Sequence, residues 1–343
     1  MSRATGAPVI GVAGRDVPIE LIEAHCAMVR RLELHPGSEI AEATEILGKG
    51  IDPTATVALA GVLDADSVPL DAIVLCSDSD ATQRLFFGLR ELARIEPSRG
   101  LPPVHLIDLV HLPRASSLAY AREEVGLLAA RLETWTGRGV SAAELAHAIR
   151  DRDRARQLLA ELRPRLSGAD FFVWRSALDE LPAAVAVERL RAERETDRAA
   201  LPPAMPVALT GSSHWGAEVV AAIEACGTRV VADDCSGGSL GLEIGVREPT
   251  LDGLAERYWR DGDSAHRGSA PERAARLALA AERAGAQAIV SYARRRDDAA
   301  SWEVAAVRSA TSLPVLVLHD QEFGGVDGSR LRAALAEIGE SRV

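Results

Sequence analysis

The segment VALTGSSHWGAEVVAAIEACGTRVVADD, Val207–Asp234, indicates a parallel α/β fold. Its apolar run at 207–211 predicts a buried strand, the spacing of apolar residues in 217–226 predicts a helix, and 228–234 predicts a second strand. Two strands joined by one helix are typical of a βαβ unit, in which the strands are parallel. Ligands of such sheets bind outside the carboxyl ends of the strands, so the residues that follow each strand are the candidates for a binding site.

The same segment differs from a dinucleotide-binding fingerprint. That motif requires three closely spaced glycines, so that the backbone can approach a pyrophosphate. Here Gly211 and Gly216 are separated by SSHW, so the middle glycine is missing and the bulky Trp215 stands beside the second one. Asp233 and Asp234 follow at the distance of a ribose-binding acid, but the glycine pattern does not predict a nucleotide cofactor.

Alternating strands and helices recur on both sides of a long helical stretch. We therefore predict an α/β protein with two Rossmann- or flavodoxin-like parallel-sheet domains and a helical segment between them. The expected parts are an N-terminal α/β domain at 1–115, a helical connecting segment at 116–205 and a C-terminal α/β domain at 206–343. The expected strands are 8–14, 71–77, 102–113, 207–211, 228–234, 286–292 and 314–320, and the expected helices include 17–32, 78–92, 217–226, 272–285 and 301–311.

Composition excludes several classes of function. The 343 residues carry a net charge of −11, which argues against a nucleic-acid partner because phosphate binding needs concentrated positive charge. We find neither a long apolar run nor a secretory signal, so we expect no membrane association and a cytoplasmic location. The cysteines Cys26, Cys76, Cys226 and Cys235 form no CxxC pair, so we expect neither a disulfide framework nor a metal site.

Several stretches, taken together, resemble subunits of the 2-hydroxyacyl-CoA dehydratases and benzoyl-CoA reductases. The resemblance covers nearly the whole chain and is carried in order by VPIELIEAHCAMVRRL (17–32), VSAAELAHAIRDRDRARQLLAEL (140–162), LSGADFF (166–172), the segment at 209–239, LDGLAERYWR (251–260), the segment at 284–323 and DGSRLRAAL (327–335). It implies a two-subunit complex in which three cysteines hold a [4Fe–4S] cluster. It also implies an ATP-driven activator that supplies an electron to reduce a CoA thioester to a ketyl radical.

The three ligand cysteines that the resemblance implies are missing from this sequence. By alignment with the family pattern, their positions are occupied by Asp52, Ser79 and Asp297. Oxygen ligands are harder and weaker than thiolates for iron–sulfur clusters. We therefore expect no cofactor in this chain, with the [4Fe–4S] cluster of the family held by a partner subunit. Family geometry further implies that these three positions line one cleft.

The residues of the expected cleft allow more than one role. Asp52, Asp297 and Asp298 suit a cation site or a general base, and each also suits the N-cap of the helix that follows it. Ser213 and its neighbours lie at a strand-to-helix turn that favours an anion, although Ser213 also suits a helix cap. The catalytic residues are left unassigned, and the candidates for substrate binding are Cys76, Ser212, Ser213, His214, Asp234 and Cys235.

Two functions of different classes follow. In the first, the chain is a cluster-free partner subunit that contributes acyl-CoA binding and assembly to a heteromeric lyase or reductase complex. In the second, it is a stand-alone acyl-CoA or small-anion binding protein, or a non-redox enzyme that reuses the cleft between the domains. The expected partner is a paralogous dehydratase-like subunit or a second copy of the chain. The aromatic segments 84–89 and 171–178 are candidates for that interface.

Overall fold

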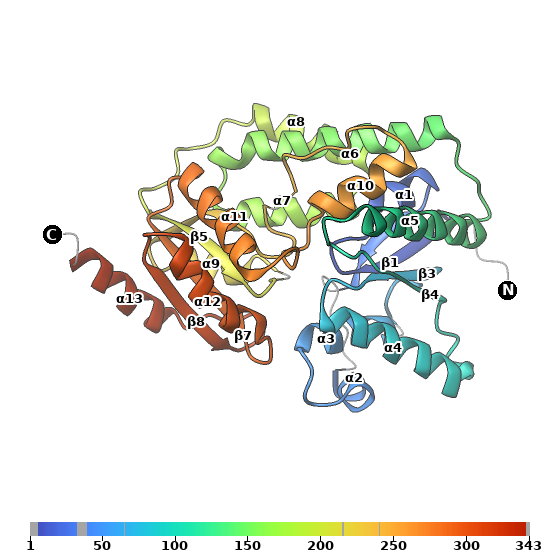
Figure 1. Ribbon diagram of the computed structural model, residues 1–343, viewed down its shortest axis with the longest axis horizontal. Coiled ribbons are helices and arrows are strands. Elements are labelled where there is room, and N and C mark those ends of the chain that lie inside the picture. The colour runs from blue at the N-terminus through green and yellow to red at the C-terminus, as the bar shows by residue number, and fades with distance from the viewer. Residues whose placement is uncertain (1–5, 33–39, 65, 215, 240, 341–343) are drawn as a thin grey trace. The chain divides into compact units, whose positions relative to one another are not determined.

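The computed structural model describes residues 6–32, 40–64, 66–214, 216–239 and 241–340 (Figure 1). The chain divides into two compact units, each drawn from three separate parts of the sequence. The first unit consists of 1–158, 177–193 and 243–262, and the second of 159–176, 194–242 and 263–343. The domain boundaries expected near residues 115 and 205 stay a prediction.

The first unit is built on a four-stranded parallel sheet. Its strands lie in the order β2 (Met28–Arg31), β1 (Val9–Ala13), β3 (Ala72–Cys76) and β4 (Val104–Ile107). Strand β2 lies on one side of β1, and β3 and β4 follow on the other side. The crevice between the carboxyl ends of β1 and β3 is therefore the point at which the strand order reverses.

Helices cover both faces of this sheet. Alternate residues of β3 point to opposite faces, so Ala72 and Val74 join one core while Ile73 and Leu75 join the other. The first core is completed by α1 (Ile19–Ala24), α5 (Ala115–Thr136), α6 (Ala142–Leu162) and α10 (Leu251–Asp261). The second is completed by α2 (Ile40–Leu47), α3 (Pro53–Leu63) and α4 (Asp80–Ile95).

An ionic group joins three of these helices in the interior of the first unit. Glu20 of α1 is fully buried, and its carboxylate accepts hydrogen bonds from Arg156 of α6 and, at 2.9 Å, from the hydroxyl of Tyr258 of α10. Burial opposes ionisation of Glu20, but the positive charges of Arg156 and Arg257 outweigh it and lower its pKa. The group is therefore a charged, hydrogen-bonded contact between segments far apart in sequence.

The helix expected over residues 17–32 is wrong in its second half. Helix α1 ends at Ala24, and Cys26 adopts a positive φ of 55°, which turns the chain back toward the sheet. Met28–Arg31 then forms β2, in parallel register with β1. The apolar residues of this segment fit helical spacing, but pairing with β1 at the open edge decides the outcome.

The second unit repeats the arrangement of the first. Its parallel strands lie in the order β6 (Thr228–Asp233), β5 (Met205–Gly211), β7 (Ala288–Arg294) and β8 (Val315–Gln321). Helices α9 (Glu218–Glu224) and α13 (Gly328–Glu340) pack on one face, and α11 (Ala270–Arg283) and α12 (Ala299–Ala310) on the other. Figure 1 shows these helices around β5, β7 and β8. Two all-parallel sheets confirm the predicted α/β fold class.

The long helical stretch is confirmed as α5, α6, α7 (Gly168–Glu180) and α8 (Ala183–Glu195). Ser141 and Glu144 form a capping box at the start of α6, since each side chain accepts a hydrogen bond from the backbone N–H of the other. Among the residues that the structure describes, no helix is both long enough and apolar enough to cross a bilayer.

Candidate functional site

The carboxyl ends of β5 and β7 meet at the strand-order reversal of the second sheet. Gly211 has a φ of 112°, and a Cβ atom at this position would lie 2.0 Å from the carbonyl oxygen of Tyr292. The same carbonyl accepts a hydrogen bond of 2.9 Å from the backbone N–H of Ser212. Only glycine allows the chain to pass so close to β7 before turning into the loop.

Ser212 links the two loops that leave this point. Its hydroxyl donates to Oδ2 of Asp297 over 2.6 Å and accepts from the backbone N–H of Arg294 over 3.1 Å. The guanidinium of Arg294 lies 3.5 Å from Asp297 and donates to the carbonyl of Ser213. The structure thus brings two predicted residues, Ser212 and Asp297, into direct contact, together with Arg294, which sequence reasoning missed.

None of the three caps expected in this region, Asp297, Asp298 and Ser213, makes a side-chain capping bond to its helix. Asp298 occupies the N-cap of α12 without a side-chain capping bond, and Asp297 turns instead to Ser212. Helix α9 begins at Glu218 with Ala217 at its N-cap, so Ser213 does not cap it.

A buried cluster of three potential ligands lies beside this contact. His214 follows β5, Asp233 ends β6, and Cys235 follows two residues later. Their relative exposures are 3%, 5% and 0%, and one ligand atom from each lies within 4.8 Å of the others. Because β5 and β6 are neighbours in a parallel sheet, their carboxyl ends carry these side chains to one place.

Asp234 sits next to this cluster with an unusual proton affinity. Burial raises the pKa of Asp234 to about 7, a hydrogen bond with Thr210 opposes the rise, and the charge of Asp233 adds to it. Its Oδ1 atom is buried and has no hydrogen-bond partner among the described residues. A buried acceptor of this kind costs about 1–3 kcal/mol of stability. Asp234 is therefore a group that gains a proton near neutral pH.

The first unit has a similar reversal point between β1 and β3. Gly14 has a φ of 83°, and a Cβ atom there would lie 2.3 Å from the sulfur of Cys76. That sulfur accepts a hydrogen bond of 3.2 Å from the backbone N–H of Asp16. Burial, followed by the charges of Asp78 and Asp16, raises the pKa of Cys76 well above its ordinary value. The thiol is thus protonated and packed, which suits a structural role.

Asp52 and Ser79 are helix caps in the first unit. Asp52 accepts a hydrogen bond of 3.0 Å from the backbone N–H of Thr54 at the start of α3. Ser79 forms a capping box with Thr82 at the start of α4. The cap interpretation is confirmed for Asp52. Asp297 belongs to the other unit, so the convergence of the three positions stays a prediction.

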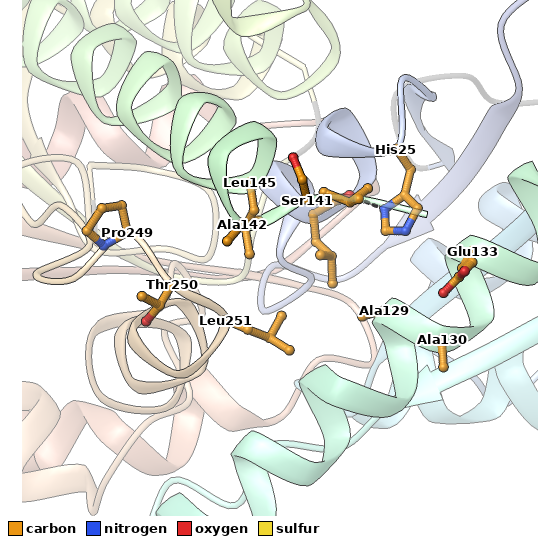
Figure 2. A pocket seen from close by; sticks show the side chains of 12 residues that line it. His25, Ala129, Ala130, Glu133, Ser141, Ala142, Leu145, Pro249, Thr250 and Leu251 are labelled. Atoms are coloured by element: carbon orange, nitrogen blue, oxygen red, sulfur yellow. Dashed lines mark hydrogen bonds between the residues drawn. The ribbon is translucent and has the colours of Figure 1, made fainter. Parts of the chain in front are cut away.

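The first unit also contains an apolar pocket of about 380 Å³ (Figure 2). Leu145, Leu251 and Ala129 line its middle, with His25 and Glu133 at one side. His25 precedes β2, whose first residue pairs with the first residue of β1, so the pocket lies toward the amino ends of the strands. None of the predicted site residues lines it. It is therefore separate from the candidate site at the strand carboxyl ends.

Asp233 was not identified from the sequence as a member of the buried cluster. Nor was Arg294 identified, whose contacts with Ser213 and Asp297 join the loops after β5 and β7. Both are strand-terminal residues: Asp233 is the last of β6, and Arg294 is the last of β7. A charged residue at the carboxyl end of a parallel strand is the signal that could have found them. The exposed Trp302 in the first turn of α12 was also overlooked.

Comparison with known families agrees with this architecture. A search of curated proteins gave no match. The family model described as 2-hydroxyglutaryl-CoA dehydratase, D-component, matches residues 16–335, which include every strand of the two sheets except β1 and both loops of the candidate site. The chain therefore belongs to the 2-hydroxyglutaryl-CoA dehydratase D-component family.

Proposed function

We propose that the chain is a cluster-free partner subunit of a dehydratase- or reductase-like complex, to which it contributes acyl-CoA binding and assembly. One observation carries this proposal. The chain matches the family over 16–335, yet none of the three positions that would hold the family's cluster is a cysteine. Asp52 and Ser79 cap helices, and Asp297 accepts from Ser212. Each of these side chains already has a local hydrogen-bonding role.

The donor set does not fit a [4Fe–4S] cluster. Such clusters are held by cysteine thiolates, whereas these three positions offer only oxygen atoms. The two buried cysteines, Cys76 and Cys235, do not compensate, because two thiols are fewer than the three that the family's cluster uses. We therefore assign no electron-transfer step to this chain, and a cluster-bearing partner would have to supply it.

The proposed acyl-CoA contribution is placed at the carboxyl edge of the second sheet. In parallel sheets the crevice at the strand-order reversal is where ligands bind, and here it is formed by the loops that begin at Ser212 and Arg294. The family description names a CoA thioester as the substrate of the dehydratase. In this proposal the loops at this edge contact the thioester, and the partner subunit performs the chemistry, because the three ligand positions of this chain lack cysteine.

Two exposed apolar side chains support a role in assembly. In the segments expected at an interface, Phe86, Phe171 and Phe172 are buried, whereas Phe87 is 57% and Val173 is 56% exposed. The predicted interface therefore reduces to these two exposed positions. Large exposed apolar side chains are typical anchors of protein interfaces.

The test is co-expression with a paralogous subunit that retains all three cysteines. After anaerobic purification we expect a one-to-one complex, with iron and sulfide only on the paralogue. Phe87→Ser should weaken the complex by about tenfold or more, since an interface anchor contributes at least about 1–2 kcal/mol. Leu127→Ser is the matched control, because Leu127 is similarly exposed but lies outside the predicted interface.

Two outcomes would contradict the proposal. Stable reconstitution of a four-iron cluster on the isolated chain would show that it is not cluster-free. Sedimentation of a 36.4 kDa monomer in the presence of the paralogue would instead favour a stand-alone acyl-CoA or small-anion binding protein.

A further inference from the structure

The buried group formed by His214, Asp233 and Cys235 combines imidazole, carboxylate and thiol in one place. We propose that these three residues form a binding site for a single transition-metal ion of the zinc type. This inference does not rest on the proposed function, because the site belongs to the second unit alone and involves none of the positions Asp52, Ser79 and Asp297. The spacing of the residues in sequence does not reveal the site, since its ligands come from the ends of two different strands.

The geometry of the group suits one ion. Zinc binds nitrogen and oxygen at about 2.0–2.2 Å and thiolate sulfur at about 2.3 Å, so ligand atoms in a tetrahedral site stand roughly 3.3–3.8 Å apart. The three ligand atoms lie within 4.8 Å of one another, and Nε2 of His214 is 3.0 Å from Oδ2 of Asp233. Side-chain adjustments of up to about 1 Å therefore bring all three to coordination distance. Three protein ligands leave the fourth position for water or another small ligand.

His214 is the member of the group whose bonding is otherwise incomplete. It is 3% exposed, yet neither ring nitrogen makes a hydrogen bond to any residue that the structure describes. The 3.0 Å approach to Asp233 lacks hydrogen-bond alignment. Two side chains that bind the same ion approach each other closely without forming a hydrogen bond, because the lone pair of each points at the metal. The ring of Phe172, with its centroid 4.5 Å away, packs against the imidazole and restricts its orientation.

The backbone holds the carboxylate of Asp233 in position. Its Oδ1 accepts a hydrogen bond of 2.9 Å from the backbone N–H of Cys235, while Oδ2 faces His214. A Cβ atom at Gly238 would lie 2.5 Å from the Cγ of Asp233, so the loop closes around the carboxylate only with glycine there. The carboxylate and the cysteine are thus fixed relative to each other before any ion binds.

The charges around the site select the kind of ion. Asp233 and Asp234 face the thiol of Cys235, and Arg294 and Arg163 supply positive charge nearby. Two guanidinium groups oppose any cation, so magnesium and calcium, which depend on oxygen ligands and charge, are disfavoured. Zinc and cobalt gain affinity from imidazole and thiolate. On binding, the S–H bond of Cys235 breaks, its proton leaves to solvent, and the sulfur lone pair forms the coordinate bond.

The test measures metal on the isolated full-length chain. We expect about one zinc ion per chain by elemental analysis after purification, because the described residues contain one such three-ligand group. Substitution by Co²⁺ should give a thiolate-to-cobalt charge-transfer band. Loss of a direct ligand in Cys235→Ser or His214→Gln should weaken zinc binding by more than about 100-fold, since even groups behind the ligands affect affinity about 10- to 100-fold.

Cys76→Ser is the matched control, because Cys76 is equally buried at a strand end but lies in the first unit. It should keep the full metal content and the cobalt band. Circular dichroism establishes that each variant is folded, and His214→Gln provides the test if Cys235→Ser does not fold. The proposal is overturned if the folded wild-type chain binds neither Zn²⁺ nor Co²⁺, or if both site variants keep the wild-type affinity. Neither result depends on whether the chain binds a partner subunit.

Discussion

Replacement of Asp234 by asparagine should change how the stability of the protein depends on pH. The pKa of Asp234 is raised by burial from 3.8 to about 7, so the folded state holds a proton that the unfolded chain has already released. Below about pH 4 both states are protonated and the carboxyl has no effect on stability. As the pH rises from there through 7, the wild-type protein loses stability, and the neutral asparagine does not.

The size of this effect follows from the shift. Each pH unit between the two pKa values is worth about 1.36 kcal/mol, which gives about 2.5 kcal/mol of differential stability between pH 5 and pH 8. Asp234 as a whole is half-buried, so solvent screening reduces the expected value to about 2 kcal/mol. The difference in unfolding free energy between Asp234→Asn and wild type should therefore be about 2 kcal/mol larger, in favour of the variant, at pH 8 than at pH 5.

Urea unfolding followed by circular dichroism measures this difference. A chelator should be present at both pH values, so that metal binding by Cys235 does not contribute. Asp80→Asn is the control, because that side chain is 78% exposed and its surface ion pair with Arg84 contributes less than about 1 kcal/mol. If wild type and Asp234→Asn change stability in parallel between the two pH values, the burial argument is refuted.

Three further substitutions test the packing within each unit. Glu20→Ala should lower the unfolding free energy by about 3–5 kcal/mol, because it breaks a buried ion pair by removing the carboxylate that Arg156 and Tyr258 contact, and a loss below about 1 kcal/mol by urea titration would contradict this. Gly211→Ala should cost more than about 2 kcal/mol, because the new Cβ would meet the carbonyl of Tyr292 in a left-handed backbone conformation. Gly126→Ala, in the open middle of α5, should instead stabilise by about 0.5–1 kcal/mol in the same assay.

The fold could be predicted because most strands are short apolar runs followed by helices of amphipathic or small-residue character. The runs that became β5, β6, β7 and β8 were all recognised. Strand β2 was not, because its apolar residues continue the helical spacing of α1, and only pairing with β1 distinguishes the two. Tertiary hydrogen bonding is information that local periodicity does not contain.

The candidate site was predictable only in part. Ser212 and His214 could be located, because they follow a strand that is visible in the sequence. The partner of Ser212 is Asp297, which is 85 residues away, and nothing in the local pattern of either residue specifies that contact. The interpretation of Asp297 as a cap was reasonable for an acid before a helix, but Ser212 competes for the same carboxylate.

The burial of Glu20 has a consequence for the order in which the protein can fold. Its hydroxyl partner, Tyr258, lies 238 residues later in the chain. At a synthesis rate of about 5–20 residues per second, α1 emerges from the ribosome roughly 10–50 seconds before α10 exists to cover it. Until then the first sheet exposes the apolar surface that α10 will bury, so the nascent N-terminal half requires protection from aggregation and closes its core only when translation is nearly complete.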